Sequence, residues 1–229
     1  MTTHLVTELD LLKQRTFALV AIVEGNLSLA VKAVSRRDES AARQAIEKDA
    51  EIDKTEVRVE EECLKLLALY QPVAVDLRFI IAILKLTNDL ERIGDLAVNI
   101  AERAIFLARS EPVPEPFGFD FDYMAAKTTI MLKTSMDALI NRDTVLAAKV
   151  CSDDDEVDAI NSKVYEQVKH AIKQHPEHLD ALINLLSVSQ HLERIADHAT
   201  NIAEDVIYLA KGQIVRHTTK EPDNTLRHK

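Results

Sequence analysis

The chain has 229 residues, a formal net charge of −10, only four Gly and six Pro, and no Trp. This length suffices for one or two domains with a sizeable core, and the abundance of Ala, Leu, Glu and Lys favours α-helix almost throughout. The excess of acid argues against a nucleic-acid partner, which requires clustered Lys and Arg.

No targeting or membrane-spanning segment is evident from the sequence. The N-terminus lacks the apolar run of a signal peptide, and uninterrupted apolar stretches such as 79–84 are far shorter than the ~20 residues that span a bilayer. Cys63 and Cys151 fall within helical patterns far apart in sequence, as small core residues do in a reducing compartment. We therefore expect a cytoplasmic protein that reaches a membrane only through partners.

The first half of the chain predicts three helices. Apolar residues recur at three- and four-residue spacing over 5–34, which predicts the first helix. Asp38 is placed to cap a second helix, which ends near residue 70 because Gln71-Pro72 removes a backbone donor. A third helix is expected over 73–109. Three alternating prolines within 110–118 then predict a semi-rigid, extended linker.

The same pattern follows the linker. Helices are expected over 121–141, from Asp143 to about 174, and over 177–212, with His175-Pro176 in the place of Gln71-Pro72. The polar residues beyond 212 predict a disordered tail.

These elements predict an all-α fold of two tandem, pseudo-symmetric three-helix bundles. The bundles are expected over 1–110 and 119–212, with the linker over 111–118 and the tail over 213–229. A single continuous six-helix domain is the alternative, and the proline linker argues against it.

The strongest sign of duplication is one helix that occurs twice. Residues 90–108 read LERIGDLAVNIAERAIFLA and residues 192–210 read LERIADHATNIAEDVIYLA, with thirteen identities in nineteen positions. A repeat kept only for packing would share mainly apolar residues, but these copies also share an acidic and amide face on the helix. Its members are Glu91, Asp95, Asn99 and Glu102 in the first copy and Glu193, Asp197, Asn201 and Glu204 in the second.

The helix before each copy has an acidic face of its own, with Asp49 and Asp53 in the first half and Asp154 and Asp158 in the second. In an antiparallel hairpin the two acidic faces of each half would lie side by side. Grouped carboxylates repel one another and need water, basic partners or metal to compensate. Carboxylate oxygens suit Mg²⁺, Mn²⁺, Ca²⁺ or iron. The eight principal candidate ligands are therefore Asp49, Asp53, Glu91, Asp95, Asp154, Asp158, Glu193 and Asp197.

Five further residues are weaker candidates: Asn99, Glu102, Asn201, Glu204 and His198. His198 follows Asp197 directly, but Leu96 takes its place in the first half. Both acidic pairs recur in both halves, whereas Leu96/His198 and Arg103/Asp205, which we expect to be exposed, differ.

Arg92 and Arg194 also recur and are expected to hydrogen-bond to the ligand carboxylates. The alternative is a metal-free helical scaffold whose acidic faces are solvated.

Catalytic motifs are absent from the sequence. It contains no Gly-rich phosphate loop, no GxSxG, no HExxH and no Glu-x-x-His pair of a di-iron bundle. We therefore expect a protein that is not an enzyme, with a multinuclear-metal hydrolase or oxidase built on the same carboxylates as the alternative.

Together these residues resemble the PhoU family. The resemblance rests on QPVAVDLRF over 71–79, on LERIGD and NIAE within 86–102, and on the acid-xxx-acid pairs of both halves, and it covers the chain to about residue 212. It implies that the acidic pairs bind divalent or trivalent metal ions (Mg, Mn, Fe or Zn), in multinuclear clusters in some members.

The resemblance also implies a regulatory function. PhoU-like proteins are cytoplasmic and often homodimeric, and they restrain phosphate uptake through the phosphate ABC transporter, whose ATPase is an expected partner. They also help a phosphate-sensing histidine kinase to keep the phosphate-starvation response off when phosphate is plentiful. The chain is thus expected to be a negative regulator and an adaptor in signal transduction.

Overall fold

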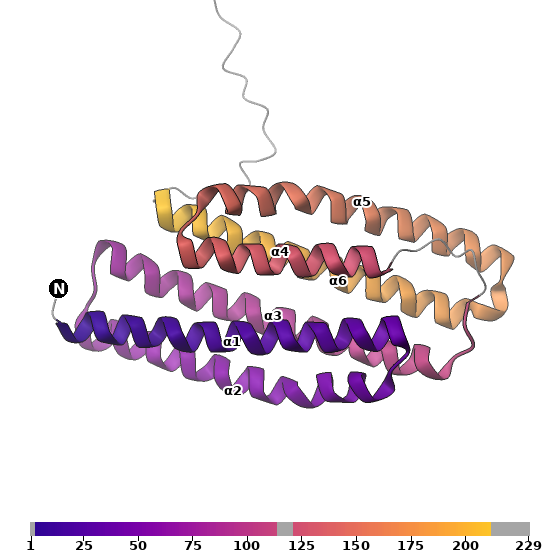
Figure 1. The fold of residues 1–229 in the computed structure, drawn as a ribbon, viewed down its shortest axis with the longest axis horizontal. Helices are drawn as coiled ribbons and strands as arrows, with labels where there is room; N and C mark the ends of the chain where they lie inside the picture. Colours follow the sequence, from indigo (N-terminus) through magenta and orange to yellow (C-terminus); the bar gives the residue numbers. More distant parts are fainter. Residues whose placement is uncertain (1–2, 114–120, 212–229) are drawn as a thin grey trace, which may run out of the picture.

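The computed structural model describes residues 3–113 and 121–211, which form six α-helices and one short 3-10 helix and contain no strand. The elements are α1 (Thr3–Arg36), α2 (Glu39–Tyr70), α3 (Ala74–Arg109), α4 (Phe121–Asn141), α5 (Thr144–Gln174), η1 (Pro176–His178) and α6 (Leu179–Lys211). Helices α1–α3 pack on one another in the lower half of Figure 1, and α4–α6 pack in the upper half. The predicted all-α fold of tandem helical bundles is confirmed. Most of the predicted linker and the whole predicted tail lie outside the described residues.

The helices begin close to the residues that the sequence predicted. The turn before the second helix of each half has the same construction. Asp38 accepts a hydrogen bond from the Ala41 amide, and Asp143 accepts hydrogen bonds from two amides of the first turn of α5. The residue before each cap, Arg37 or Arg142, has a left-handed backbone with φ of 51°. Helix α6 starts two residues later than expected, at Leu179 instead of 177, since Pro176 opens a 3-10 turn before the α-helix begins.

Helix α1 is long and apolar enough, by length and composition, to cross a membrane. In the structure, Leu12, Leu19, Val23 and Leu27 from this helix are completely buried in the protein core. A helix that packs on several others needs a wide apolar face, so core packing accounts for this composition.

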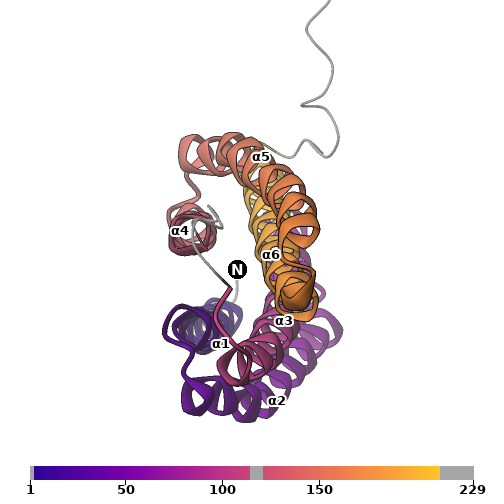
Figure 2. The same ribbon diagram turned by 90° about the vertical axis from the view of Figure 1, so that its right-hand side faces the viewer.

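One hydrophobic core runs through both repeats. Fully buried members come from every α-helix and include Leu27, Ile52, Ile93, Met131, Val157 and Ile195. Viewed along the bundle, α3 lies beside α6, α1 faces α4, and α2 and α5 are outermost (Figure 2). The contact between α3 and α6 is therefore both the boundary between the repeats and a central part of the packing.

Two of the four residues that the sequence placed on the surface are buried. Leu96 is 3% exposed and Asp205 is 7% exposed, so the expectation was wrong for these two, whereas the Arg103 side chain is 42% exposed. Asp205 accepts from the Lys85 Nζ at 3.1 Å across the contact. These positions differ between repeats because the two sides of one interface need complementary residues.

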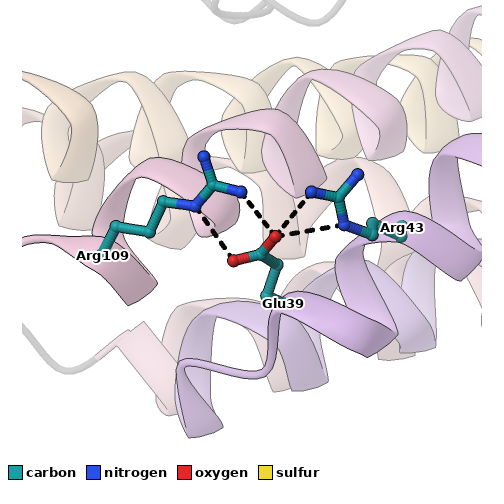
Figure 3. A network of polar contacts seen from close by, with 3 residues as sticks. All are labelled: Glu39, Arg43 and Arg109. Atoms are coloured by element: carbon teal, nitrogen blue, oxygen red, sulfur yellow. Dashed lines mark hydrogen bonds and ion pairs between the residues drawn. The ribbon is translucent and has the colours of Figure 1, made fainter.

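Where α2 begins and α3 ends, a charged network joins the two helices. Arg109 donates to Glu39 through Nε at 3.0 Å and Nη2 at 2.6 Å, and Arg43 donates to the same carboxylate (Figure 3). The hydrogen bonds from Arg109 and then Arg43 lower the pKa of Glu39 to about 2.

We predict that Glu39→Gln destabilises the protein at neutral pH and has little effect in strong acid. The folded-state pKa of Glu39 lies below its ordinary value, so its stabilisation is present above about pH 4.5 and is lost as the pH falls towards about 2. Urea midpoints of wild type and variant should therefore converge over this range. Glu47→Gln, at an exposed position of the same helix, is the control and should show no such convergence. A Glu39→Gln deficit of equal size at pH 7 and pH 2.5 would contradict the account.

Candidate metal centre

Close helix packing brings the acidic faces together. A Cβ atom on Gly94 of α3 would lie 3.0 Å from Ile52 Cδ1 and 3.6 Å from Asp49 Oδ1, both on α2. A side chain at this position would therefore press on α2, and glycine permits the approach. In the second repeat the equivalent position is Ala196, which is also small and is completely buried. A small residue therefore stands at the corresponding position of both hairpins.

In the second repeat, four predicted acids share one site, which we call the second-repeat carboxylate site. Asp154 and Asp158 on α5 and Asp197 on α6 each place a carboxylate oxygen within 4.8 Å of the other two. Glu193 lies one turn before Asp197, and burial followed by the charges of Asp197 and Asp158 raises its pKa. The antiparallel hairpin has therefore placed the two acidic faces side by side, as the sequence predicted.

Asp154 has the most strongly raised pKa of the second-repeat carboxylate site. Burial, followed by the charges of Asp197 and Asp158, raises the pKa of Asp154 to about 6. Its Oδ1 atom is buried and has no hydrogen-bond partner among the described residues. A buried carboxylate oxygen without a partner is costly, and a cation would satisfy it. The donors are all carboxylate oxygens, which fit a hard divalent or trivalent cation.

The first repeat has a looser counterpart, the first-repeat carboxylate site, formed by Asp49, Asp53, Glu91 and Asp95. Burial, followed by the charges of Asp53 and Asp95, raises the pKa of Asp49. The Oδ1 atom of Asp49 is also buried and has no hydrogen-bond partner in the described part of the chain. Burial, followed by the charge of Asp95, raises the pKa of Glu91. Within the described residues 3–113 and 121–211, three carboxylates lie this close together only in the second repeat, and the first-repeat carboxylate site contains no such group.

Arginine already neutralises part of the first-repeat carboxylate site. Arg92 Nη1 donates to Asp95 Oδ2 at 3.4 Å, and Arg92 Nε lies 3.4 Å from Glu91 Oε2. The predicted contact between this arginine and the candidate ligands is therefore present. In the second repeat, the charge of Arg194 lowers the pKa of Glu193 and Asp197 without reversing the upward shift of either group.

Glu56 belongs with the first-repeat carboxylate site, although it was not among the predicted ligands. Burial, followed by the charges of Glu60 and Asp53, raises its pKa. Its position seven residues after Asp49 puts it on the same face of α2, which was the available signal in the sequence.

The weaker candidates lie in different places. Asn99 is half-buried on α3, and Glu102 is exposed, with its carboxylate 3.9 Å from Arg103. The others, His198, Asn201 and Glu204, line a groove between α3 and α6. There the Nδ1 atom of His198 is 2.8 Å from Asp89 Oδ1.

Asp89 itself was missed in the sequence. It is 7% exposed, and it stands in the polar run KLTNDLER over 85–92, so the sequence carried no clear signal for its burial.

These features define a class of protein: a duplicated helical bundle with a carboxylate site on the last two helices of each repeat. A family model described as the PhoU domain matches residues 18–104 and 121–206. The chain belongs to the PhoU family.

Relatives of similar length support this membership. The chain is 38% identical over 213 residues to the phosphate-specific transport system accessory protein PhoU homolog of Aquifex aeolicus, covering 93% of this chain and 96% of that protein. It is 36% identical over 210 residues to the homolog from Pseudomonas aeruginosa, covering 92% of this chain and 86% of that protein.

Solved structures share the fold over nearly the whole chain. The crystal structure of PhoU from Pseudomonas aeruginosa superimposes with a TM-score of 0.87 at 35% identity, covering 90% of this chain and 99% of that one. The phosphate transport system regulatory protein PhoU from Streptococcus pneumoniae superimposes with a TM-score of 0.80 at 29% identity, covering 92% and 99%.

We predict that Asp154→Asn stabilises the metal-free protein at pH 7 by about 1 kcal/mol, after allowance for solvent screening, because it removes a charge that is buried and lies close to other carboxylates. The folded-state pKa of Asp154, about 6, lies above its ordinary value of 3.8. The native side chain therefore favours folding below about pH 4 and does so less as the pH rises through about 6.

The advantage of Asp154→Asn should accordingly shrink between pH 7 and pH 4. Urea denaturation in the presence of a chelator measures it, with Asp10→Asn on α1 as an exposed control of equal charge change. A variant that is less stable than wild type at pH 7 without metal would contradict the assignment of repulsion to this site.

Proposed function

We propose that this chain is a cytoplasmic accessory protein of a phosphate transport system, which restrains phosphate uptake and phosphate-starvation signalling without acting as an enzyme. The observation that carries the proposal is full-length similarity, including both repeats, to proteins whose names describe an accessory or regulatory role in phosphate transport. The ranges matched by the family model, 18–104 and 121–206, include the helical segments that hold both carboxylate sites.

The two carboxylate sites are proposed to bind metal ions. Asp154, Asp158, Glu193 and Asp197 would hold the cation in the second repeat, and Asp49, Asp53, Glu91 and Asp95 would hold it in the first. The buried, unpartnered oxygens of Asp49 and Asp154 support this assignment, since each lacks the hydrogen bond that would compensate its burial. A bound Mg, Mn, Fe or Zn ion would supply positive charge there. Because each site draws on two helices, its occupancy would stiffen the α2–α3 and α5–α6 hairpins.

The regulatory action is proposed to proceed through protein partners, namely the ATPase of the phosphate ABC transporter and a phosphate-sensing histidine kinase, with the chain as a homodimer. One surface that suits such contacts is the turn between α2 and α3. There Leu69 is 65% exposed and Val73 is 74% exposed, and exposed apolar side chains grouped at one turn are typical of contact surfaces. An adaptor with two such repeats can contact more than one partner.

We expect removal of one carboxylate site to remove its metal and to leave the other site loaded. Mn²⁺ titration calorimetry of Asp158→Asn/Asp197→Asn should lose the second-repeat component, and Asp53→Asn/Asp95→Asn should lose the first-repeat component. The charge-matched control is Asp10→Asn/Glu47→Asn, at exposed positions of α1 and α2, which should titrate as wild type. Unchanged stoichiometry in both site variants would refute the ligand assignment.

In cells, deletion of the gene should raise a phosphate-starvation reporter in phosphate-rich medium, and the wild-type gene should restore repression. The Asp158→Asn/Asp197→Asn gene should restore repression poorly if the metal supports regulation, whereas Asp10→Asn/Glu47→Asn should restore it fully. A reporter that does not respond to the deletion would overturn the regulatory proposal. Metal-dependent turnover of phosphoesters by the purified protein would instead favour a hydrolase.

A further inference from the structure

One face of α2 is exposed to solvent along most of the helix, which lies on the outside of the bundle (Figure 2). The residues of this face recur at alternating four- and three-residue spacing, which is typical of a helix that packs against another helix. Two of them are large apolar side chains, Val57 at 49% exposed and Leu64 at 60% exposed. We call this line of residues the α2 seam, and its members are Ala50, Lys54, Val57, Glu61, Leu64 and Ala68.

The corresponding face of α5 is also exposed but has a different composition. When the repeats are aligned on their carboxylate sites, Ser162 and Lys169 take the places of Val57 and Leu64. Lys169 donates instead to Glu166 of its own helix at 3.4 Å. Both faces lie outside the core, so core packing does not explain why only α2 has large apolar side chains at these positions. The difference indicates a contact that the first repeat makes and the second does not.

The charges of the α2 seam complement one another across a twofold axis. Lys54 and Glu61 are its two charged members, and neither side chain has an ion pair or hydrogen bond within the residues that the structure describes. When two copies of α2 pack antiparallel, with Val57 opposite Glu61 of the partner subunit, Lys54 packs along Leu64 of the partner subunit. The Lys54 ammonium then reaches Glu61 of the partner subunit, which lies about 4.5 Å further along the helix. The axis repeats this ion pair, so the α2 seam fits a second copy of itself.

We propose that the chain dimerises by antiparallel packing of α2 on α2 of a second copy, through the α2 seam. Ala50 then faces Ala68 of the partner subunit at both ends, where small side chains let the two helices approach closely. The contact is about 27 Å long, from Ala50 to Ala68. This inference rests on the homodimer of the proposed function and assigns its surface, and it depends on neither metal binding nor phosphate regulation.

Sedimentation equilibrium of the full-length protein tests the interface with charge reversals. Lys54→Glu or Glu61→Lys alone brings like charges together across the axis and should weaken dimerisation by about tenfold. A mixture of the two single variants should restore dimerisation, because both pairs of opposite charge form again between the two different chains. Mixing would not restore a loss that came from misfolding.

The apolar contact is tested by giving α2 the residues of α5. Val57→Ser/Leu64→Lys should sediment as a monomer at concentrations where the wild type is a dimer, and the control Ser162→Ala/Lys169→Gln should sediment as wild type. A dimer that resists this variant and both charge reversals would overturn the assigned surface and leave the homodimer standing. A monomeric wild type would overturn both, whereas the phosphate-starvation reporter tests the regulatory proposal separately.

Disulfide cross-linking tests the antiparallel register. Under mild oxidation, a mixture of Ala50→Cys and Ala68→Cys proteins should form a covalent dimer, and neither variant should do so alone, since each position lies far from its own copy. The native Cys63 is buried and is present in every sample, so the wild type gives the background. Equal cross-linking of each variant alone, or none in the mixture, would overturn the inference.

Discussion

Close helix packing, which buries grouped carboxylates in each hairpin, is the constraint on which both candidate sites depend. Small residues at Gly94 and Ala196 let each third helix approach its neighbour, and that approach places acidic faces side by side. The raised pKa values of Asp49, Asp154 and Glu193 have this common cause: burial first and neighbouring carboxylates second. A sequence selected for stability alone would replace some of these acids, and their recurrence in both repeats is the reason we propose that they form a ligand set for a cation.

The contact between the repeats follows a different rule. The two repeats have the same acids within their hairpins. At the α3–α6 contact, in contrast, corresponding residues of the two repeats differ and are complementary to one another. Asp89 meets His198 and Lys85 meets Asp205, whereas the equivalent positions of the other end hold His191, Leu96, Ser187 and Arg103. This contact therefore breaks the symmetry that duplication imposed. Since the hydrophobic core also crosses it, a change at this contact would affect both repeats together.

Much of this arrangement was predictable because it is local in sequence. Helix periodicity, Asp38 and Asp143 as caps, and the acidic faces at four-residue spacing all depend on neighbours along one chain segment, and the structure contains them. The burial of Leu96 and Asp205 and the pairing of Asp89 with His198 join residues more than a hundred positions apart or depend on how the repeats dock. Periodicity cannot report such contacts. The tighter grouping in the second repeat was equally hidden, because carboxylate spacing depends on small differences in helix packing.

Anomalous diffraction from crystals soaked in Mn²⁺ would test the central claim most directly, because it locates the ion and its ligands in one measurement. The account predicts an anomalous peak between α5 and α6 with carboxylate oxygens of Asp154, Asp158 and Asp197 about 2.0–2.6 Å away. A peak of lower occupancy is expected between α2 and α3, where Arg92 competes for the acids. The metal assignment would be contradicted if crystals soaked in Mn²⁺ showed no anomalous peak at either hairpin and the same carboxylates pointed into solvent.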